Sequence, residues 1–322
     1  MQKFSRLSRK DISVVLQNYG INEFSLLYEF SSGIENVNIK LKVKNDYLVL
    51  RRWNNTNRKN IEFECHLIKE LYKKNFPVPK LYKTLDKKEV VFFKGRYFGL
   101  FEYLPGKIVG SNKLNKRQLH SLGKKLAEIQ VALKNVKPKG ESNEKDLLNF
   151  EYDYNKVKIF KLLQKQQAVF QKIENEVKKL ELEISPLKKS VRTGPTHNDF
   201  YSQNIKFNDN KITAILDFSD ACIGAWVSDL ATTLYDTTCE KNLINISAMK
   251  TILDGYKQKI KPTQTEKSLL PKLMRHRAIR IMLFYVQHQK NLEVLTKQMK
   301  KEWQILETLK NNEKQVQKIL KK

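Results

Sequence analysis

The segment that decides the fold reads His197-Asn198-Asp199-Phe200-Tyr201-Ser202-Gln203-Asn204, and Ile215-Leu216-Asp217-Phe218 follows it closely. Asp199 stands five residues before Asn204, and Asp217 comes thirteen residues after Asn204. Between the two segments, apolar residues alternate on either side of the turn-forming triplet 208–210, a pattern typical of a β-hairpin. The hairpin would bring Asn204 and Asp217 side by side.

This spacing suits one kind of chemistry. Phosphoryl transfer from ATP needs a carboxylate that orients the acceptor hydroxyl and oxygen ligands that hold magnesium beside the phosphates. In kinase-type sites, an Asp and an Asn of one loop and a later Asp at a strand end supply these groups. The pattern therefore predicts Asp199 as the catalytic base and Asn204 and Asp217 as magnesium ligands.

Composition sets limits on the class of protein. The chain has 322 residues, 40% of them hydrophobic, which suggests two domains or lobes with a sizeable core. It carries 61 Lys and Arg against 34 Asp and Glu, a net charge of +27. Only 11 of these basic residues are Arg, and the rest are spread along the whole chain, so we interpret the charge as a generally lysine-rich surface. Nucleic-acid binding is an alternative that this dispersion does not favour.

Other features of the sequence concern where in the cell the protein is expected to be found. The longest apolar run near the C-terminus, residues 281–286, is far shorter than a membrane-spanning helix, and no apolar stretch follows the basic N-terminal segment. The three cysteines, Cys65, Cys222 and Cys239, lack the spacing of a zinc site. These observations predict a reduced, cytoplasmic protein without a membrane span.

The first hundred residues read as a small sheet with one helix. Residues 24–53 alternate like strands, with a turn at Asn45-Asp46, and a helical pattern covers 58–74. Residues 90–93 and 97–103 flank Lys94-Gly95-Arg96, which predicts a hairpin. Leu104-Pro105-Gly106 then breaks the pattern. We therefore predict one lobe over residues 1–104 and a second over 105–322.

The second lobe is predicted to be mostly helical. Apolar residues at helical spacing cover 119–133, a polar helix is expected over about 155–182, and helices continue to Lys322 with breaks near Pro262 and Pro271. The last helix carries an apolar seam from Leu292 to Leu309, which is expected to pack onto the body of the protein.

Several of these motifs together resemble the aminoglycoside phosphotransferase and choline kinase family of small-molecule kinases. The similar stretches are His197–Asn204, Leu216–Gly224 and Ser228–Ala231, in the family's order, and the resemblance covers most of residues 24–290. It implies an α+β, bilobal protein-kinase-like fold, with a small antiparallel-sheet N-lobe and a mostly helical C-lobe. It also implies ATP and Mg²⁺ as cofactors, bound in the cleft.

The resemblance extends to the phosphate-binding groups. Leu50-Arg51 looks like the strand end that bears the phosphate-contacting cation, and Glu64 looks like the ion-pair partner of this cation. The family often has Lys at this place, so Arg52 and Lys40 stay open as alternatives to Arg51.

Two further segments are implied to contact the nucleotide. The turn 31–36, with Ser32 and Gly33, resembles the turn that covers the phosphates. Residues 101–106 resemble the hinge between the lobes, where Glu102 and Leu104 would contact adenine through their backbone groups.

Three residues near the motif have other predicted roles. Asp220 follows the metal ligand Asp217 and either points toward a cationic group of the substrate or caps a turn. His197 is expected to brace the catalytic loop. Asp229 is expected to cap a helix or hold the backbone of that loop, which is a structural role in either case.

The acceptor is expected to be a hydroxyl of a small amino alcohol. The turn at Gly33-Ile34-Glu35-Asn36 is similar to that of the family's homoserine kinases, so a homoserine-like acceptor ranks first. The Asn in His197-Asn198-Asp199 looks more like choline and ethanolamine kinases, which rank second, and an aminoglycoside ranks third because residues 275–280 are basic. An inactive kinase-like module that binds nucleic acid or anionic lipid is the alternative of another class, and a protein kinase ranks low. The oligomeric state is not predicted.

Overall fold

The structure, a computed structural model, describes residues 7–30, 36–54, 56–142, 146–163, 167–240, 243–289 and 291–321. The chain forms two compact units, each described here by itself. The first comprises Met1–Gly106, Val136–Asn143 and Thr213–Ser219, and the second Lys107–Asn135, Glu144–Ile212 and Asp220–Lys322. Two later segments thus join the N-terminal residues in the first unit, and the division into lobes over 1–104 and 105–322 stays a prediction.

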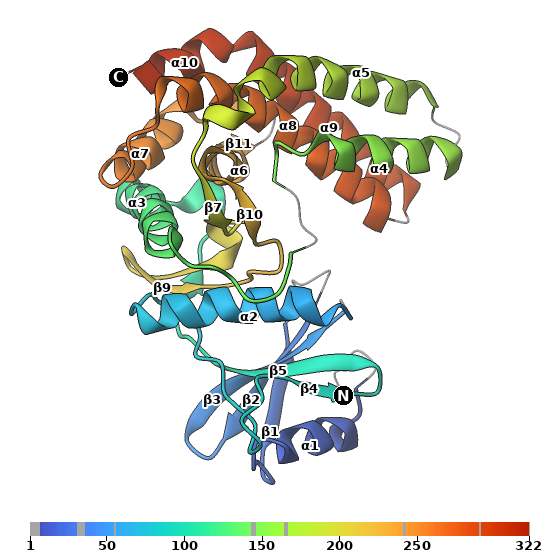
Figure 1. The fold of residues 1–322 in the computed structure, drawn as a ribbon, viewed down its shortest axis with the longest axis vertical. Helices are drawn as coiled ribbons and strands as arrows, with labels where there is room; N and C mark the ends of the chain where they lie inside the picture. The colour runs from blue at the N-terminus through green and yellow to red at the C-terminus, as the bar shows by residue number, and fades with distance from the viewer. Residues whose placement is uncertain are drawn as a thin grey trace. The chain divides into compact units, whose positions relative to one another are not determined.

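The first unit contains a five-stranded antiparallel sheet (Figure 1). Its strands lie in the order β1-β2-β3-β5-β4. They are β1 (Ser25–Glu29), β2 (Asn36–Val43), β3 (Asp46–Trp53), β4 (Val91–Phe93) and β5 (Arg96–Glu102). The sheet expected from the alternating pattern is therefore present.

Two tight turns join strands of this sheet. Phe93 pairs with Arg96, so Lys94 and Gly95 form the predicted hairpin turn, both with positive φ (47° and 73°). Val43 pairs with Asp46, which places the other turn at Lys44 and Asn45, one residue earlier than expected. Lys44 takes φ 52°, a left-handed conformation that the sequence did not signal.

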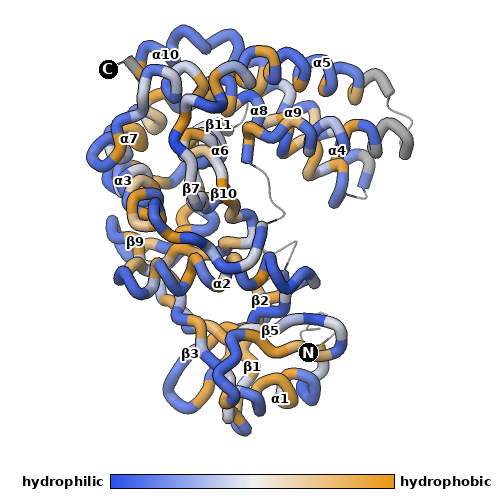
Figure 2. Tube along the Cα trace, viewed as in Figure 1, coloured by the Kyte–Doolittle hydropathy of each residue, from blue (hydrophilic) through white to orange (hydrophobic). Residues whose placement is uncertain are grey.

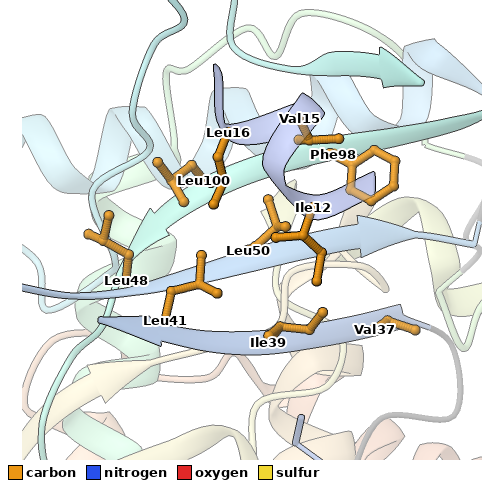
Figure 3. Close-up of a cluster of buried hydrophobic side chains, with 10 residues drawn as sticks. All are labelled: Ile12, Val15, Leu16, Val37, Ile39, Leu41, Leu48, Leu50, Phe98 and Leu100. Atoms are coloured by element: carbon orange, nitrogen blue, oxygen red, sulfur yellow. The ribbon is translucent and has the colours of Figure 1, made fainter. Parts of the chain in front are cut away.

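A short helix, α1 (Arg9–Gln17), covers one face of the sheet (Figure 3). Its buried residues Ile12, Val15 and Leu16 pack against the alternate side chains Val37, Ile39 and Leu41 of β2 and against neighbours from β3 and β5. The helix begins at a capping box, in which Ser8 and Asp11 each bond the backbone N–H of the other. We did not predict this helix.

The helix predicted over 58–74 is α2 (Arg58–Lys73). Asn57 caps it by accepting from the Lys59 N–H, and Ile61, Ile68 and Leu71 form part of its buried face. Figure 2 shows hydrophobic and hydrophilic residues alternating along it, as expected for a helix that packs on one side.

The second unit is mostly helical (Figure 1). Its α-helices are α3 (Lys116–Leu133), α4 (Phe150–Leu163), α5 (Gln167–Ile184), α6 (Trp226–Thr238), α7 (Ile246–Lys257), α8 (Gln264–His288), α9 (Leu292–Asn311) and α10 (Glu313–Lys321). Helix α9 packs against α8 through a seam that includes Leu295, Leu306 and Leu309, as predicted. No helix within the described ranges is long and apolar enough to cross a membrane.

Two predictions for this unit differ from the structure. The expected polar helix over 155–182 corresponds to two helices, α4 and α5. Helix α8 continues through Pro271, where a break was expected. Proline removes one helical hydrogen bond, but Leu269, Leu270 and Leu273 around it are fully buried, and their packing offsets this loss.

Short strands position the segment around Asp199. Strand β7 (Thr193–Thr196) pairs with β10 (Cys222–Ala225) immediately before this segment. Strands β6 (Lys107–Ile108), β8 (Ile205–Asn208) and β9 (Lys211–Ile215) form a sheet in the order β6-β8-β9 directly after it. Strands β8 and β9 are the hairpin predicted around 208–210.

Candidate active site

The first unit brings together three of the predicted site residues. Arg51 lies near the end of β3, Glu64 lies on α2, and Asp217 follows β9. Arg51 Nη1 is 3.1 Å from Glu64 Oε1, and Arg51 Nη2 donates to Asp217 Oδ1 at 2.9 Å. A single guanidinium therefore joins the predicted ion-pair partner to the predicted metal ligand.

The ion pair of Arg51 and Glu64 is almost fully buried, and this burial affects the pKa of both side chains. Arg51 is 7% exposed and Glu64 is 4% exposed, and the Trp53 indole donates to Glu64 Oε2 at 2.8 Å. Burial raises the pKa of Glu64, and the attraction of Arg51 opposes this rise. Burial by itself lowers the pKa of Arg51, but Glu64 and Asp217 outweigh it, so the net direction is upward.

Asp217 has an unusual backbone conformation. Its φ is 60°, in the left-handed region that non-glycine residues seldom adopt. Its Oδ1 accepts from Ser219 Oγ at 2.8 Å as well as from Arg51, and its side chain is 38% exposed. Backbone strain of this kind clusters at functional sites.

The structure distinguishes Arg51 from the other two candidate cations. Arg52 donates from Nη2 to Asn54 Oδ1 at 3.3 Å and follows Arg51 on the strand, so it points to the opposite face. Lys40 Nζ lies over the rings of Tyr103, Tyr47 and Tyr28, at 3.7, 4.5 and 5.6 Å from their centroids. Of the three, Arg51 makes the contact with Glu64.

The other predicted nucleotide contacts are only partly described. Ser32 and Gly33 lie outside the described residues. Glu102 ends β5, its N–H donates to the Lys80 carbonyl at 2.9 Å, and its carboxylate accepts from the Lys80 N–H at 3.3 Å. Leu104 follows β5 and is half-buried.

The second unit holds the loop with the predicted base. Asn204 Nδ2 donates to Asp199 Oδ2 at 2.7 Å and to the Asp199 carbonyl at 2.9 Å. The two polar residues of the motif are therefore in direct contact. Because Asn204 uses its nitrogen here, its side-chain oxygen is directed away from Asp199.

Asp229 fixes the backbone at the start of this loop. It lies fully buried on α6 and accepts from the N–H of His197 at 3.0 Å and of Asn198 at 2.9 Å. Burial raises the pKa of Asp229, and these bonds to the ionised form oppose the rise. Of the two structural roles predicted for Asp229, these contacts match the second, in which it holds the backbone of the loop. His197 is also fully buried and meets the Phe200 ring edge-on.

One residue that the sequence motif did not predict touches the predicted base, and a second holds that residue in place. Arg277 on α8 donates from Nη2 to Asp199 Oδ1 at 3.0 Å and to Asp236 Oδ2 at 2.7 Å. Asp236 lies on α6, and its burial raises its pKa to about 6, although Arg277 opposes this shift. The basic run 275–280 was noted only as a general charge, because no short motif links Arg277 to a residue 78 positions earlier.

Asp220 belongs to the same neighbourhood. Its charge adds to those of Asp236 and Asp199 in raising the pKa of Arg277. The acidic side chains near Arg277 thus include Asp220, the predicted contact for a cationic group of the substrate.

The predicted site residues fall into two clusters, one in each unit. Arg51, Glu64 and Asp217 form the first, and Asp199 and Asn204 belong to the second. The expected proximity of Asn204 and Asp217 stays a prediction. The described residues contain no group of three or more His, Cys, Asp or Glu side chains that could hold a metal.

Comparison with solved structures identifies the fold. The fold is similar to a microcompartment-associated aminopropanol kinase, with a TM-score of 0.76 and 15% identity over 96% of this chain and 98% of that one. It is also similar to the amicoumacin kinase hAmiN in complex with AMP-PNP, Ca²⁺ and Ami, with a TM-score of 0.73 and 16% identity over 92% of each chain. The predicted α+β protein-kinase-like fold is confirmed.

The family follows from the sequence match. The model of the phosphotransferase enzyme family matches residues 27–259, and the chain belongs to this family. A homoserine kinase of Zymomonas mobilis subsp. mobilis is 24% identical over 287 residues, which cover 88% of each chain. The protein is a small-molecule phosphotransferase with an alcohol group as acceptor, as predicted.

Proposed function

We propose that the protein transfers the γ-phosphoryl group of ATP, with Mg²⁺, to a hydroxyl of a small amino alcohol, and that a homoserine-like acceptor ranks first. The observation that carries the proposal is the contact of one buried cation, Arg51, with both Glu64 and Asp217. A cation held by a buried carboxylate suits the α- and β-phosphates of ATP, because it is fixed in place before they arrive. In this proposal Glu102 and Leu104 contact adenine through backbone groups.

The residues assigned to magnesium fit the metal. Asn204 turns its amide oxygen away from Asp199, and Asp217 presents a carboxylate that is 38% exposed. Magnesium prefers oxygen ligands and usually takes one or two from the protein, with waters and phosphate oxygens as the others. When bound, it would neutralise charge on the β- and γ-phosphates.

Asp199 acts on the acceptor. Its Oδ2 is held by Asn204 and its Oδ1 by Arg277, so the carboxylate is fixed, and each oxygen keeps a second lone pair. Asp199 accepts the hydroxyl proton as the acceptor oxygen bonds to the γ-phosphorus. The bond from that phosphorus to the bridging oxygen breaks, and ADP leaves.

The ranking of acceptors rests on the relatives. Homoserine kinases match over 88% of the chain, and the aminopropanol kinase shares the fold. Choline or ethanolamine is the first alternative and an aminoglycoside the second.

The experiment measures ATP consumption with magnesium against homoserine, choline, ethanolamine and aminoglycosides. One compound should raise turnover, and Asp199→Asn should lower it by about 100-fold or more, because it removes the base. Asp209→Asn is the matched control. It also removes a carboxylate, but from the exposed turn between β8 and β9, which follow Asp199 in the chain.

Other outcomes would change the proposal. If no compound raises turnover while Mg-ATP raises the melting temperature, the acceptor ranking fails and the nucleotide assignment stands. If ATP neither binds nor is consumed, and retention on heparin falls steeply with salt, a nucleic-acid or anionic-lipid binding module replaces the kinase.

A further inference from the structure

Three arginines lie within one and a half turns of α8, and the structure uses them differently. Arg275 is 3% exposed and pairs with Glu176, Glu183 and Glu313. Arg280 pairs with Asp153 and donates to the carbonyls of Asp146 and Asn149. Arg277 instead contacts Asp199, the proposed base. The first two therefore hold helices and loops together, whereas Arg277 lies where the acceptor must come.

The guanidinium of Arg277 is only partly used by the protein. Its Nε donates to Asp236 at 3.1 Å and its Nη2 to Asp236 and Asp199 at 2.7 and 3.0 Å. Its Nη1 donates to no residue in the part of the chain that the structure describes. The side chain is 19% exposed. An arginine has five N–H donors in a rigid fork, so two donors of Arg277 remain for water or for a bound anion.

The charged groups around Arg277 restrict which chemical groups an acceptor can carry when its hydroxyl lies beside Asp199. Any hydroxyl that reaches Asp199 comes beside the guanidinium of Arg277, whose charge Asp199 and Asp236 balance but whose Nη1 makes no described contact. A carboxylate, in contrast, is the group that a guanidinium fork binds best. Asp220 and Asp236 act on the same guanidinium, so acidic groups for an ammonium are nearby. A zwitterionic acceptor matches both charges.

We propose that Arg277 is the specificity-determining residue of the acceptor site and that its Nη1 binds a carboxylate of the acceptor. The acceptor is then a hydroxy amino acid, and simple amino alcohols are poor substrates. This inference rests on the proposed function, because it takes Asp199 as the base.

The test uses pairs of acceptors that differ only in the carboxylate. Serine and ethanolamine, homoserine and 3-aminopropan-1-ol, and threonine and 1-aminopropan-2-ol form such pairs. Wild type should prefer the hydroxy amino acid of the pair that it phosphorylates. Arg277→Gln should lower this preference by about tenfold to 100-fold, mainly through a higher KM for the amino acid, because a charge-assisted hydrogen bond is lost.

Two variants serve as controls. Lys272→Gln removes the same charge from the same helix at a residue with no described contact to Asp199, and the preference should stay as in wild type. Arg277→Lys keeps the charge but not the fork, and it should retain part of the preference. Thermal unfolding of each variant shows whether it is folded.

Two outcomes overturn the inference, and a third separates it from the proposed function. If wild type phosphorylates the simple amino alcohol of a pair equally well or better, Arg277 does not select a carboxylate, but the kinase assignment stands. If Arg277→Gln lowers kcat for both members of a pair by the same factor, Arg277 only positions Asp199. If no acceptor is phosphorylated, the proposed function fails, and calorimetric binding of the same pairs to wild type and Arg277→Gln decides the inference separately.

Discussion

Arg51 and Glu64 depend on each other, because both are nearly excluded from water. A buried carboxylate without its cation pays the desolvation cost without the attraction that offsets it. Trp53 adds a hydrogen bond to Glu64 and Asp217 adds a second partner for Arg51, so four side chains form one connected group. A change at one of these residues should affect both the stability of the first unit and the phosphate contact.

Glu64→Gln should lower the free energy of unfolding by about 3 to 5 kcal/mol, since it leaves the buried charge of Arg51 with a single partner. It should also lower kcat with ATP, because Arg51 loses its anchor. Urea unfolding and steady-state kinetics measure the two effects. Glu62→Gln is the control on the same helix, because Glu62 pairs with Arg58 at the surface, where such pairs contribute about 0 to 1 kcal/mol. Equal losses in the two variants would show that burial does not govern this pair.

At the scale of single elements, α1 shows how a few side chains build the sheet core. It supplies Ile12, Val15 and Leu16 to a cluster that otherwise comes from β2, β3 and β5 (Figure 3). Without the helix, one face of the sheet would lose its cover, because a sheet needs a packed face to be stable.

Leu16→Ala should lower the free energy of unfolding by about 2 to 5 kcal/mol, the usual cost of a cavity at a fully buried leucine. Val14→Ala on the exposed side of the same helix should cost much less, because it removes little buried surface. Chemical denaturation of both variants compares the two faces directly. A loss below about 1 kcal/mol for Leu16→Ala would mean that α1 contributes little to the fold.

The elements differ in how well the sequence predicts them, and the reasons are local. Strand β2 and helix α2 repeat their apolar residues at the strand and helix periods, so both were predicted. Helix α1 has only nine residues and three buried ones, which is too short a pattern to stand out without the sheet beneath it. Pro271 suggested a break, but the buried residues around it keep α8 continuous.

At the scale of the whole molecule, the site residues are divided between the two units. Asp199, Asn204 and Asp217 could be predicted because a short motif fixes their spacing. The contacts of Arg277 and Asp236 with this site could not, because they arise only when α6 and α8 pack together. The roles of all these residues in catalysis remain predictions, and they require that both units act on one nucleotide.

Hydrogen exchange tests this requirement. Addition of magnesium and a non-hydrolysable ATP analogue at 100 times its Kd should slow exchange by up to about 100-fold, both in β3 of the first unit and in the segment 197–208 of the second. Magnesium alone is the control for effects of the ion. Protection confined to one unit would contradict the assignment of Arg51 and Asp199 to the same reaction.

The way Asp229 holds the loop before Asp199 has a consequence for which substitutions this loop can accept. The carboxylate of Asp229 binds the main-chain N–H groups of residues 197 and 198, so these two hydrogen bonds do not depend on which side chains stand there. The choice of residue at position 198 is limited instead by its backbone φ of 62°, which asparagine tolerates better than most residues. The asparagine at 198 therefore has a backbone reason in addition to its likeness to choline and ethanolamine kinases. Substitutions at position 198 that tolerate this φ should therefore leave the two hydrogen bonds from the loop to Asp229 intact.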